Sequence, residues 1–220
     1  MIEIKGLGKQ FQNETQISYR DITFETGRSY MLLGASGCGK STLLNMIAGV
    51  LSPTVGTIQI DGKDMTAASQ KEKDKFRIEK IGYIFQDFKL INEMTVADNI
   101  GILRLEGIDI SGMDEILTAL DISEKKNAKI KHLSGGQKQR VSIARALVKK
   151  SDIILADEPT GNLNFAIGEQ VIKVLVDVSK GKTLIAVTHD DRLAKYFDEV
   201  IDMNEMTSGM QDVPSEKEEC

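Results

Sequence analysis

The sequence predicts an α/β protein with a largely parallel sheet core, an antiparallel β region at its N-terminus and an inserted helical lobe. Short apolar runs alternate with helical patterns, which is typical of strands that feed helices in a parallel sheet. Turn signals separate strand-like pieces in the first sixty residues, which indicates the antiparallel region. A helical, loop-rich stretch then interrupts the strands for too long to be a simple connection. The apolar runs lie at residues 30–33, 57–60, 81–85, 152–156 and 183–187.

Length and composition indicate a single domain. The chain has 220 residues, 41% of them hydrophobic, which suffices for one packed α/β unit. Periodicity is lost from Glu205 onward, so we expect the end of the chain to be flexible. The expected parts of the domain over residues 1–220 are a core of residues 1–86 and 134–204, a helical lobe of residues 87–133 and a tail of residues 205–220.

Charge and hydropathy argue against several classes of protein. No apolar run approaches the ~20 residues of a membrane span, and the N-terminus lacks the apolar stretch of a signal peptide. We therefore expect the chain to be cytoplasmic. The net charge is −5, and the last ten residues carry −3 of it, so no broad basic face for nucleic acid is expected. The two cysteines, Cys38 and Cys220, fit a reducing compartment.

A phosphate-binding motif directly follows the apolar run at residues 30–33. GASGCGKST, residues 34–42, matches G-x-x-x-x-G-K-[ST] and precedes a helical pattern, the context that this motif requires. Glycine lets the backbone N–H groups point at a β-phosphate, and the helix dipole favours the anion. A glycine-rich turn that only caps a helix is the alternative, and the full pattern argues against it. The predicted ATP-binding residues are Gly34, Ser36, Gly37, Cys38, Gly39, Lys40, Ser41 and Thr42.

Individual roles follow from the chemistry of these side chains. Lys40 brings a positive charge to the β- and γ-phosphates, Ser41 brings a hydroxyl to Mg²⁺, and Thr42 adds a polar contact. Cys38 stands at a free position of the motif, which favours a small tolerated residue over a redox role.

Polar side chains also follow three other predicted strands. Asp157 and Glu158 end the run at residues 152–156, and ligands collect at the carboxyl ends of such strands. We expect Asp157 to hold Mg²⁺ and Glu158 to act as general base, although alone the pair could cap a helix. Gln86 is a candidate Mg²⁺ ligand, and His189 a candidate donor to the γ-phosphate. Either could be an ordinary loop residue, but both share the rim expected for Lys40.

LSGGQ, residues 133–137, predicts the start of a helix. Ser134 and Gln137 form a capping box ahead of a periodic apolar helix. Gly135 and Gly136 are poor helix formers, so their presence indicates that bare backbone N–H groups bind an anion.

With this motif the chain resembles the ATP-binding subunits of ATP-binding-cassette (ABC) transporters, whose signature is LSGGQ. The resemblance extends over nearly the whole chain. Five motifs stand in the family's order: the P-loop at Gly34 to Thr42, the Q-loop at Gln86, the signature at Leu133 to Gln137, the acidic strand end at Asp157 and Glu158, and the switch histidine at His189.

The resemblance implies ATP hydrolysis with Mg²⁺ in a head-to-tail, ATP-sandwich homodimer. Ser134 and Gly136 of one subunit would contact the γ-phosphate held by Lys40 of the other. It also implies an aromatic ring on adenine, for which Phe11 is the candidate, with a core position as the alternative. The family's usual aspartate after the catalytic acids is Asn164 here, which puts communication across the dimer in question.

The stretches FQDFKLINEMTVADNI and DEPTGNLN are similar to one branch of the family, that of macrolide exporters, lipoprotein-release systems, antimicrobial-peptide resistance transporters and a cell-division relative. This implies a separate transmembrane permease whose coupling helix sits near residues 88–93, with the chain peripheral on the inner face of the cell membrane. An importer subunit, or a soluble ATPase of iron-sulfur assembly or cell division, is the alternative. By this resemblance the lobe is a few residues shorter than expected, and we expect no C-terminal regulatory domain of the kind found in some importers.

Overall fold

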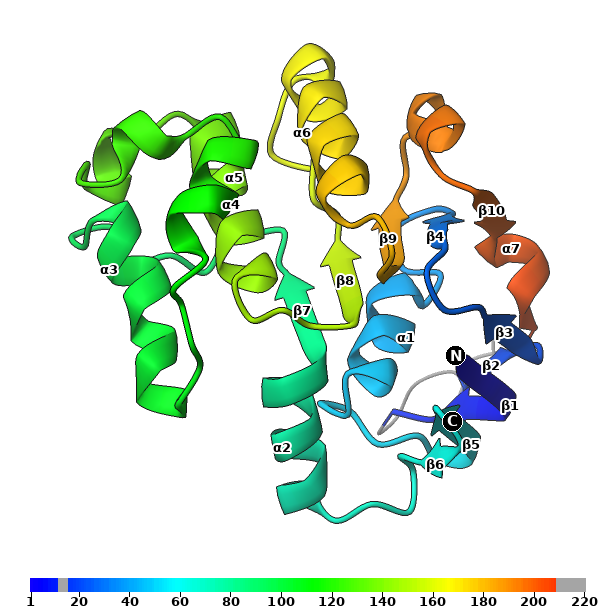
Figure 1. Cartoon of the computed structure of the whole chain (residues 1–220). Helices are drawn as coiled ribbons and strands as arrows, with labels where there is room; N and C mark the ends of the chain where they lie inside the picture. Colours follow the sequence, from blue (N-terminus) through cyan, green and yellow to red (C-terminus); the bar gives the residue numbers. More distant parts are fainter. Residues whose placement is uncertain (12–15, 209–220) are drawn as a thin grey trace, which may run out of the picture.

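The computed structural model describes residues 1–11 and 16–208. Its central sheet is parallel throughout, with the strand order β10-β4-β9-β8-β7 (Figure 1). Every residue of β9 is buried, because helices cover both faces of the sheet. The predicted parallel core is confirmed. Its strands are β4 (Ser29–Leu33), β7 (Ile81–Ile84), β8 (Ile153–Asp157), β9 (Thr183–Thr188) and β10 (Glu199–Asp202).

A second sheet is antiparallel and gathers most of the N-terminal strands, as expected. Its strand order is β11-β2-β1-β5-β6, and β3 also pairs with β1. The apolar run at residues 57–60 therefore belongs to this sheet and not to the parallel core. The strands are β1 (Ile2–Lys9), β2 (Ile17–Tyr19), β3 (Ile22–Phe24), β5 (Val55–Ile60), β6 (Lys63–Asp64) and β11 (Thr207–Ser208).

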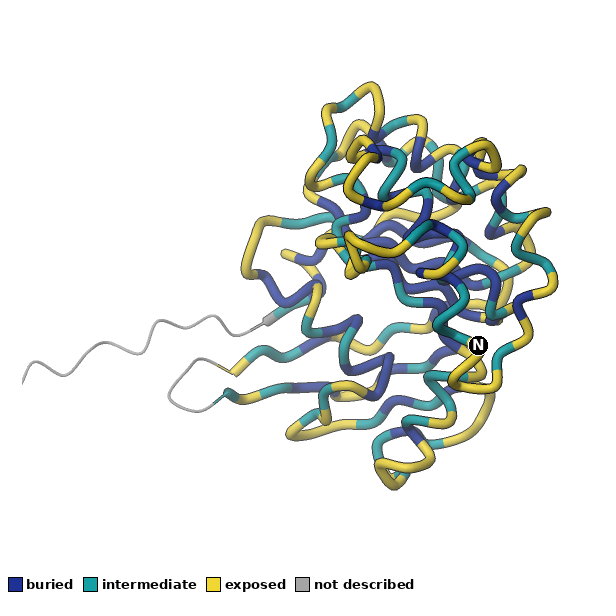
Figure 2. Tube along the Cα trace, turned by 90° about the vertical axis from the view of Figure 1, so that its left-hand side faces the viewer, coloured by how far each residue is buried: buried dark blue, intermediate teal, exposed yellow. Residues whose placement is uncertain are grey.

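Helix α1 (Lys40–Ile47) packs between the two sheets (Figure 1). Its buried side chains, including Leu43, Leu44 and Ile47, share one apolar cluster with residues of both sheets. Buried residues concentrate along the inner strands, whereas the peripheral loops are exposed (Figure 2). The start of α1, with the loop before it, is therefore held between the parallel sheet on one side and the antiparallel sheet on the other.

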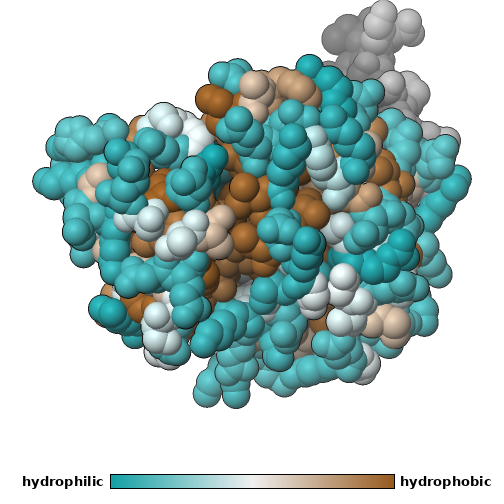
Figure 3. Space-filling view, turned by 45° about the horizontal axis from the view of Figure 1, so that its top comes forward, coloured by the Kyte–Doolittle hydropathy of each residue, from teal (hydrophilic) through white to brown (hydrophobic). Residues whose placement is uncertain are grey.

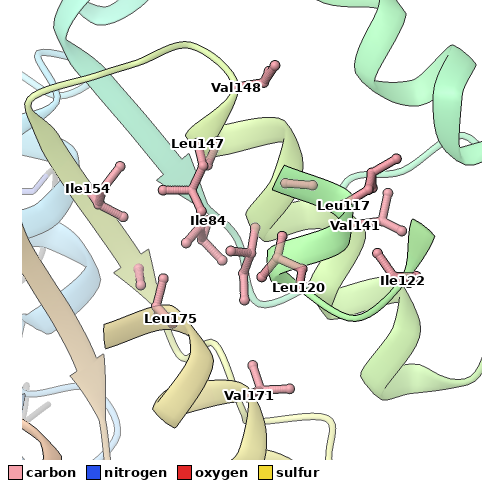
Figure 4. Close-up of a cluster of buried hydrophobic side chains, with 14 of the residues drawn as sticks. Ile84, Leu117, Leu120, Ile122, Val141, Leu147, Val148, Ile154, Val171 and Leu175 are labelled. Carbon is pink, nitrogen blue, oxygen red and sulfur yellow. The ribbon is translucent and has the colours of Figure 1, made fainter. Parts of the chain in front are cut away.

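The other helices surround the parallel sheet. The segment 87–133, expected to be a helical lobe, is indeed helical and loop-rich, but it has no core of its own within the described residues. Figure 4 shows Leu117 of α4 beside Val141 of α5, and both belong to the same apolar cluster as Ile84 of β7 and Ile154 of β8. The helices are α2 (Gln70–Lys80), α3 (Val96–Gly101), η1 (Ile102–Glu106), α4 (Met113–Ala119), η2 (Ser123–Lys125), η3 (Ile130–His132), α5 (Gly135–Leu147), α6 (Phe165–Val178), η4 (Asp191–Tyr196) and α7 (Met203–Met206).

The start of the expected flexible tail, residues 205–208, contributes to helix α7 and strand β11. Met203 and Met206 of α7 are buried, and β11 pairs with β2. One helical turn and a two-residue strand are too short to produce a periodic pattern, so these elements could not be predicted. The rest of the expected tail, with Cys220, lies outside the described residues.

Across residues 1–11 and 16–208, no helix has the length and apolar character needed to cross a membrane.

Candidate active site

The predicted phosphate loop connects β4 to α1 and contains two left-handed glycines. Gly37 has φ 85° and Gly39 φ 93°, conformations that side chains rarely adopt. Gly39 is also the N-cap residue of α1, and no side chain caps this helix. The first N–H groups of α1 therefore have no capping oxygen from a side chain, which suits an anion.

Lys40 opens α1 and directs its ammonium back toward the loop. Its Nζ donates to the carbonyl oxygens of Gly34 and Ala35, both at 2.7 Å, and lies 4.0 Å from Glu158 Oε1. The side chain is 6% exposed, so the charge is held in place. Cys38 is buried beside it, with Sγ 3.9 Å from the lysine Nζ.

Ser41 and Asp157 are joined across the loop by one hydrogen bond. Ser41 Oγ donates to Asp157 Oδ1 at 2.7 Å. Burial raises the pKa of Asp157, while the Ser41 hydrogen bond and the charge of Lys40 oppose that rise. A hydroxyl beside a carboxylate gives two hard oxygen ligands on one edge of the sheet, a donor set that fits Mg²⁺.

Glu158 stands where β8 ends, in a strained conformation. Its φ is 44°, and a non-glycine residue in this region costs on the order of 1–3 kcal/mol. Its backbone N–H donates to Val187 O of β9 at 3.1 Å, which fixes the turn. The side chain is 14% exposed, and its Oε2 lies 3.0 Å from Nδ1 of the exposed His189. The carboxylate thus faces the phosphate loop with a titratable ring beside it.

Gln86, just after β7, reaches the same place. A cavity of about 190 Å³ is lined by Ser36, Gly37, Gly39, Lys40, Ser41, Thr42, Gln86 and Glu158. Asn162 Nδ2 donates to Gln86 O at 2.9 Å, and a Cβ atom at Gly161 would lie 3.0 Å from Gln86 Nε2. The loop after Asp157 and Glu158 is therefore packed against Gln86.

The signature residues lie elsewhere. Ser134 caps α5: its Oγ accepts from Gln137 N, and Gln137 Oε1 accepts from Ser134 N at 3.0 Å, so the predicted capping box is confirmed. None of the signature residues lines the phosphate-loop cavity. Within one described chain the two motifs are not brought together.

The glycines of the signature have a packing reason that sequence analysis missed. A Cβ atom at Gly136 would lie 2.6 Å from Ile167 Cγ2 of α6, and one at Gly135 would lie 3.1 Å from Leu163 Cδ2. The absence of side chains therefore lets α5 approach α6, in addition to leaving the backbone bare.

Phe11 is half-buried, and among the described residues it is grouped with neither hydrophobic core. Lys9 Nζ lies 5.7 Å from the centroid of its ring. Adenine stacking remains a prediction.

The structural roles of two further residues of the site region, Arg145 and Asn164, were not predicted from the sequence. Arg145 of α5 donates to the carbonyl oxygens of Phe88 and Lys89, whose φ values are 56° and 50°. A half-buried guanidinium on the signature helix thus holds two strained residues just beyond Gln86. Asn164 is the N-cap of α6, and its Oδ1 accepts from Ile167 N at 3.0 Å.

Comparison with known proteins agrees with this architecture. Residues 18–161 match the ABC transporter family. The chain is 37% identical over 215 residues to the macrolide export ATP-binding/permease protein MacB of Shewanella, covering 93% of this chain and 33% of that longer protein. It is 36% identical over 209 residues to the lipoprotein-releasing system ATP-binding protein LolD of Nitratidesulfovibrio vulgaris, covering 88% of each.

A solved structure gives the same result. The ATP-binding cassette MJ0796, dimeric and bound to ADP and Pi in a post-hydrolysis state, superposes with a TM-score of 0.80 at 31% identity, covering 96% of this chain and all of that one. The fold and site define a P-loop ATPase of the cassette class. The chain belongs to the ABC transporter family, as an ATP-binding ATPase similar to MacB and LolD.

Proposed function

We propose that the chain hydrolyses MgATP in a head-to-tail homodimer and thereby drives a separate transmembrane permease. The observation that carries this proposal is the convergence of Lys40, the Ser41–Asp157 pair and Glu158 at the carboxyl ends of β4 and β8. The names of MacB and LolD favour an exporter or lipoprotein-release system over an importer.

In the proposed mechanism each group has one task. Lys40 binds the β- and γ-phosphates, which requires its ammonium to leave the carbonyls of Gly34 and Ala35. Ser41 and Asp157, with Gln86, would hold Mg²⁺, which neutralises charge on the phosphates when bound. Glu158 accepts a proton from the attacking water, and His189 at 3.0 Å orients that carboxylate and donates to the γ-phosphate.

The proposed dimer is supported by the separation of the two motifs within one chain, since no signature residue lines the phosphate-loop cavity. Ser134 and Gly136 would complete the site of the partner, as the dimeric state of MJ0796 supports. The face toward which β8 runs has hydrophobic side chains gathered near its centre and hydrophilic ones around them (Figure 3), an arrangement that suits a contact surface. The permease would dock near residues 88–93, where Ile91 is 46% exposed, and would hold the chain at the membrane.

Two variants test the proposal. Lys40→Ala should abolish binding of MgADP, measured by calorimetry, and unchanged affinity would refute the phosphate-loop assignment. Glu158→Gln should bind ATP but lose about 10²–10⁴-fold in turnover, because its general base is removed. It should accumulate as an ATP-dependent dimer in size-exclusion chromatography, since hydrolysis no longer releases the pair. Only monomer at saturating ATP would contradict the sandwich.

A further inference from the structure

The phosphate loop rests on a tyrosine from the antiparallel sheet. Tyr19, at the end of β2, is 4% exposed, and its hydroxyl donates to the carbonyl oxygen of Gly39 at 2.8 Å. Gly39 is the residue before Lys40, and the same carbonyl accepts the N–H of Leu43 at 2.9 Å to begin α1. One oxygen atom thus joins the first turn of α1 to a buried phenol.

The packing around this contact leaves little freedom. A Cβ atom at Gly39 would lie 2.7 Å from the Tyr19 hydroxyl oxygen and 3.1 Å from Ile17 Cγ2, so β2 packs directly beneath the left-handed glycine. Burial raises the pKa of Tyr19 above its ordinary value, although a hydrogen bond with Thr42 opposes that rise. The phenol therefore stays protonated, and can donate, at neutral pH.

Strand β2 is itself held from both sides. It pairs with β1 on one side and with β11 on the other, where Thr207 lies opposite Tyr19. Arg20 N donates to Met206 O at 2.8 Å. The C-terminal segment also reaches the start of the loop, because a Cβ atom at Gly34 would lie 3.0 Å from Met203 Cβ. The segment 203–208 therefore braces both ends of the phosphate loop, one directly and one through Tyr19.

We propose that Tyr19 is a positioning residue for nucleotide binding: its hydroxyl fixes the Gly39 carbonyl, and with it the turn from which Lys40, Ser41 and Thr42 project. The residue acts through the loop and does not touch the phosphates. The inference rests on the proposed binding of MgATP at this loop.

The test is Tyr19→Phe in the full chain, which keeps the ring and removes only the hydroxyl. Without the bond the first turn of α1 samples more conformations, so we expect the Kd for MgADP and the KM for ATP to rise about fivefold, the effect of one hydrogen bond, with kcat nearly unchanged. Amide exchange at Leu43, which shares the Gly39 carbonyl, should accelerate, while that at Leu184 in β9 stays as in the wild type.

Tyr30→Phe is the matched control. Tyr30 is equally buried, and its hydroxyl accepts from Glu25 N at 2.8 Å, away from the phosphate loop. Tyr30→Phe should lower the Tm by about as much as Tyr19→Phe does, but it should leave the Kd for MgADP unchanged. If Tyr19→Phe and Tyr30→Phe have equal Kd values while Lys40→Ala does not bind nucleotide, the role of Tyr19 is refuted and the proposed nucleotide site is not. Full binding by Lys40→Ala would instead refute the proposed nucleotide site, and the role of Tyr19 with it.

Discussion

Gly136→Ala tests two possible reasons for a glycine at this position of the signature: close packing of α5 against α6, and a bare backbone that can bind the partner's phosphate. The added Cβ would lie 2.6 Å from Ile167 Cγ2, whereas ordinary contacts begin at 3.4 Å, so α5 and α6 must part by nearly an ångström or Ile167 must move. Overpacking of this kind costs about 1–3 kcal/mol. Alanine recovers about 1 kcal/mol of helix propensity relative to glycine.

We therefore expect a net loss of about 1 kcal/mol in the free energy of unfolding. For a chain of this size that loss lowers the Tm by about 2–4 °C, measured by thermal unfolding without nucleotide. Gly101→Ala is the matched control, because a Cβ atom at that helical position meets nothing within 4 Å. The control should be as stable as the wild type or more so.

A second substitution makes the result specific. Ile167→Ala removes Cγ2 from a side chain that is 37% exposed, so combined with Gly136→Ala it should restore the lost stability. The packing argument would be refuted if Gly136→Ala did not lower the stability, or if the loss of stability persisted when Gly136→Ala is combined with Ile167→Ala. The ATPase rate of the restored double variant should stay below that of the wild type if the bare backbone also serves the partner's phosphate; full activity would leave packing as the only reason.

Two other predictions concern the buried polar groups of the site. Burial raises the pKa of Asp157, so the folded state binds a proton more tightly than the unfolded state, and stability falls as pH rises from the ordinary carboxyl range through that raised pKa. Asp157→Asn should therefore be more stable than the wild type at neutral pH without Mg²⁺ and equal to it at pH 3, measured by urea unfolding; a gain that persists at pH 3 would contradict this cause. Arg145→Met removes the guanidinium that donates to the carbonyls of Phe88 and Lys89, while the Phe88 carbonyl keeps the Ser142 hydroxyl at 3.3 Å. The change should cost about 2 kcal/mol, with Arg145→Lys losing less. Equal stability of Arg145→Met and Arg145→Lys would show that the hydrogen bonds to Phe88 and Lys89 do not contribute to the stability.

Most of the parallel core could be predicted because its strands carry their own signal. The runs that became β4, β7, β8 and β9 are apolar and bounded by turn residues, and burial on both faces requires that composition. Strand β10 was missed because it lies at an edge of the sheet and is mostly exposed, with acidic residues at both ends. The pattern of a half-exposed edge strand is not apolar.

The residues that form and support the site fall into two groups, according to whether the contacts that position them are local or long-range in sequence. Local motifs placed the phosphate loop and the capping box of α5 correctly in the chain, because glycines and caps act within a few residues. The bonds from Tyr19 to Gly39 and from Arg145 to Phe88 join residues far apart in sequence, and neither side chain belongs to a local pattern. Only the folded arrangement shows that these residues support the motifs.

Asn164, where the family resemblance suggests an aspartate, provides the last prediction. Its Oδ1 caps α6 by accepting from Ile167 N, and aspartate caps helices as well as asparagine does, with a favourable helix-dipole interaction of about 0.3–1 kcal/mol. Asn164→Asp should therefore keep or slightly raise the stability, whereas Asn164→Ala should lose about 1 kcal/mol.

The ATPase effect of Asn164→Asp tests a different property. Asn164 lines a cavity with His189 and Arg192, so a carboxylate there gains charge-assisted hydrogen bonds that the amide lacks. We expect turnover at saturating ATP to rise about twofold to fivefold, equivalent to up to about 1 kcal/mol of transition-state stabilisation, with the KM nearly unchanged because the residue does not line the phosphate-loop cavity. Since the cap is preserved, a change in rate cannot be attributed to unfolding of α6. Equal turnover would make Asn164 a neutral replacement, and lower turnover in the aspartate variant would show that the amide itself serves the reaction.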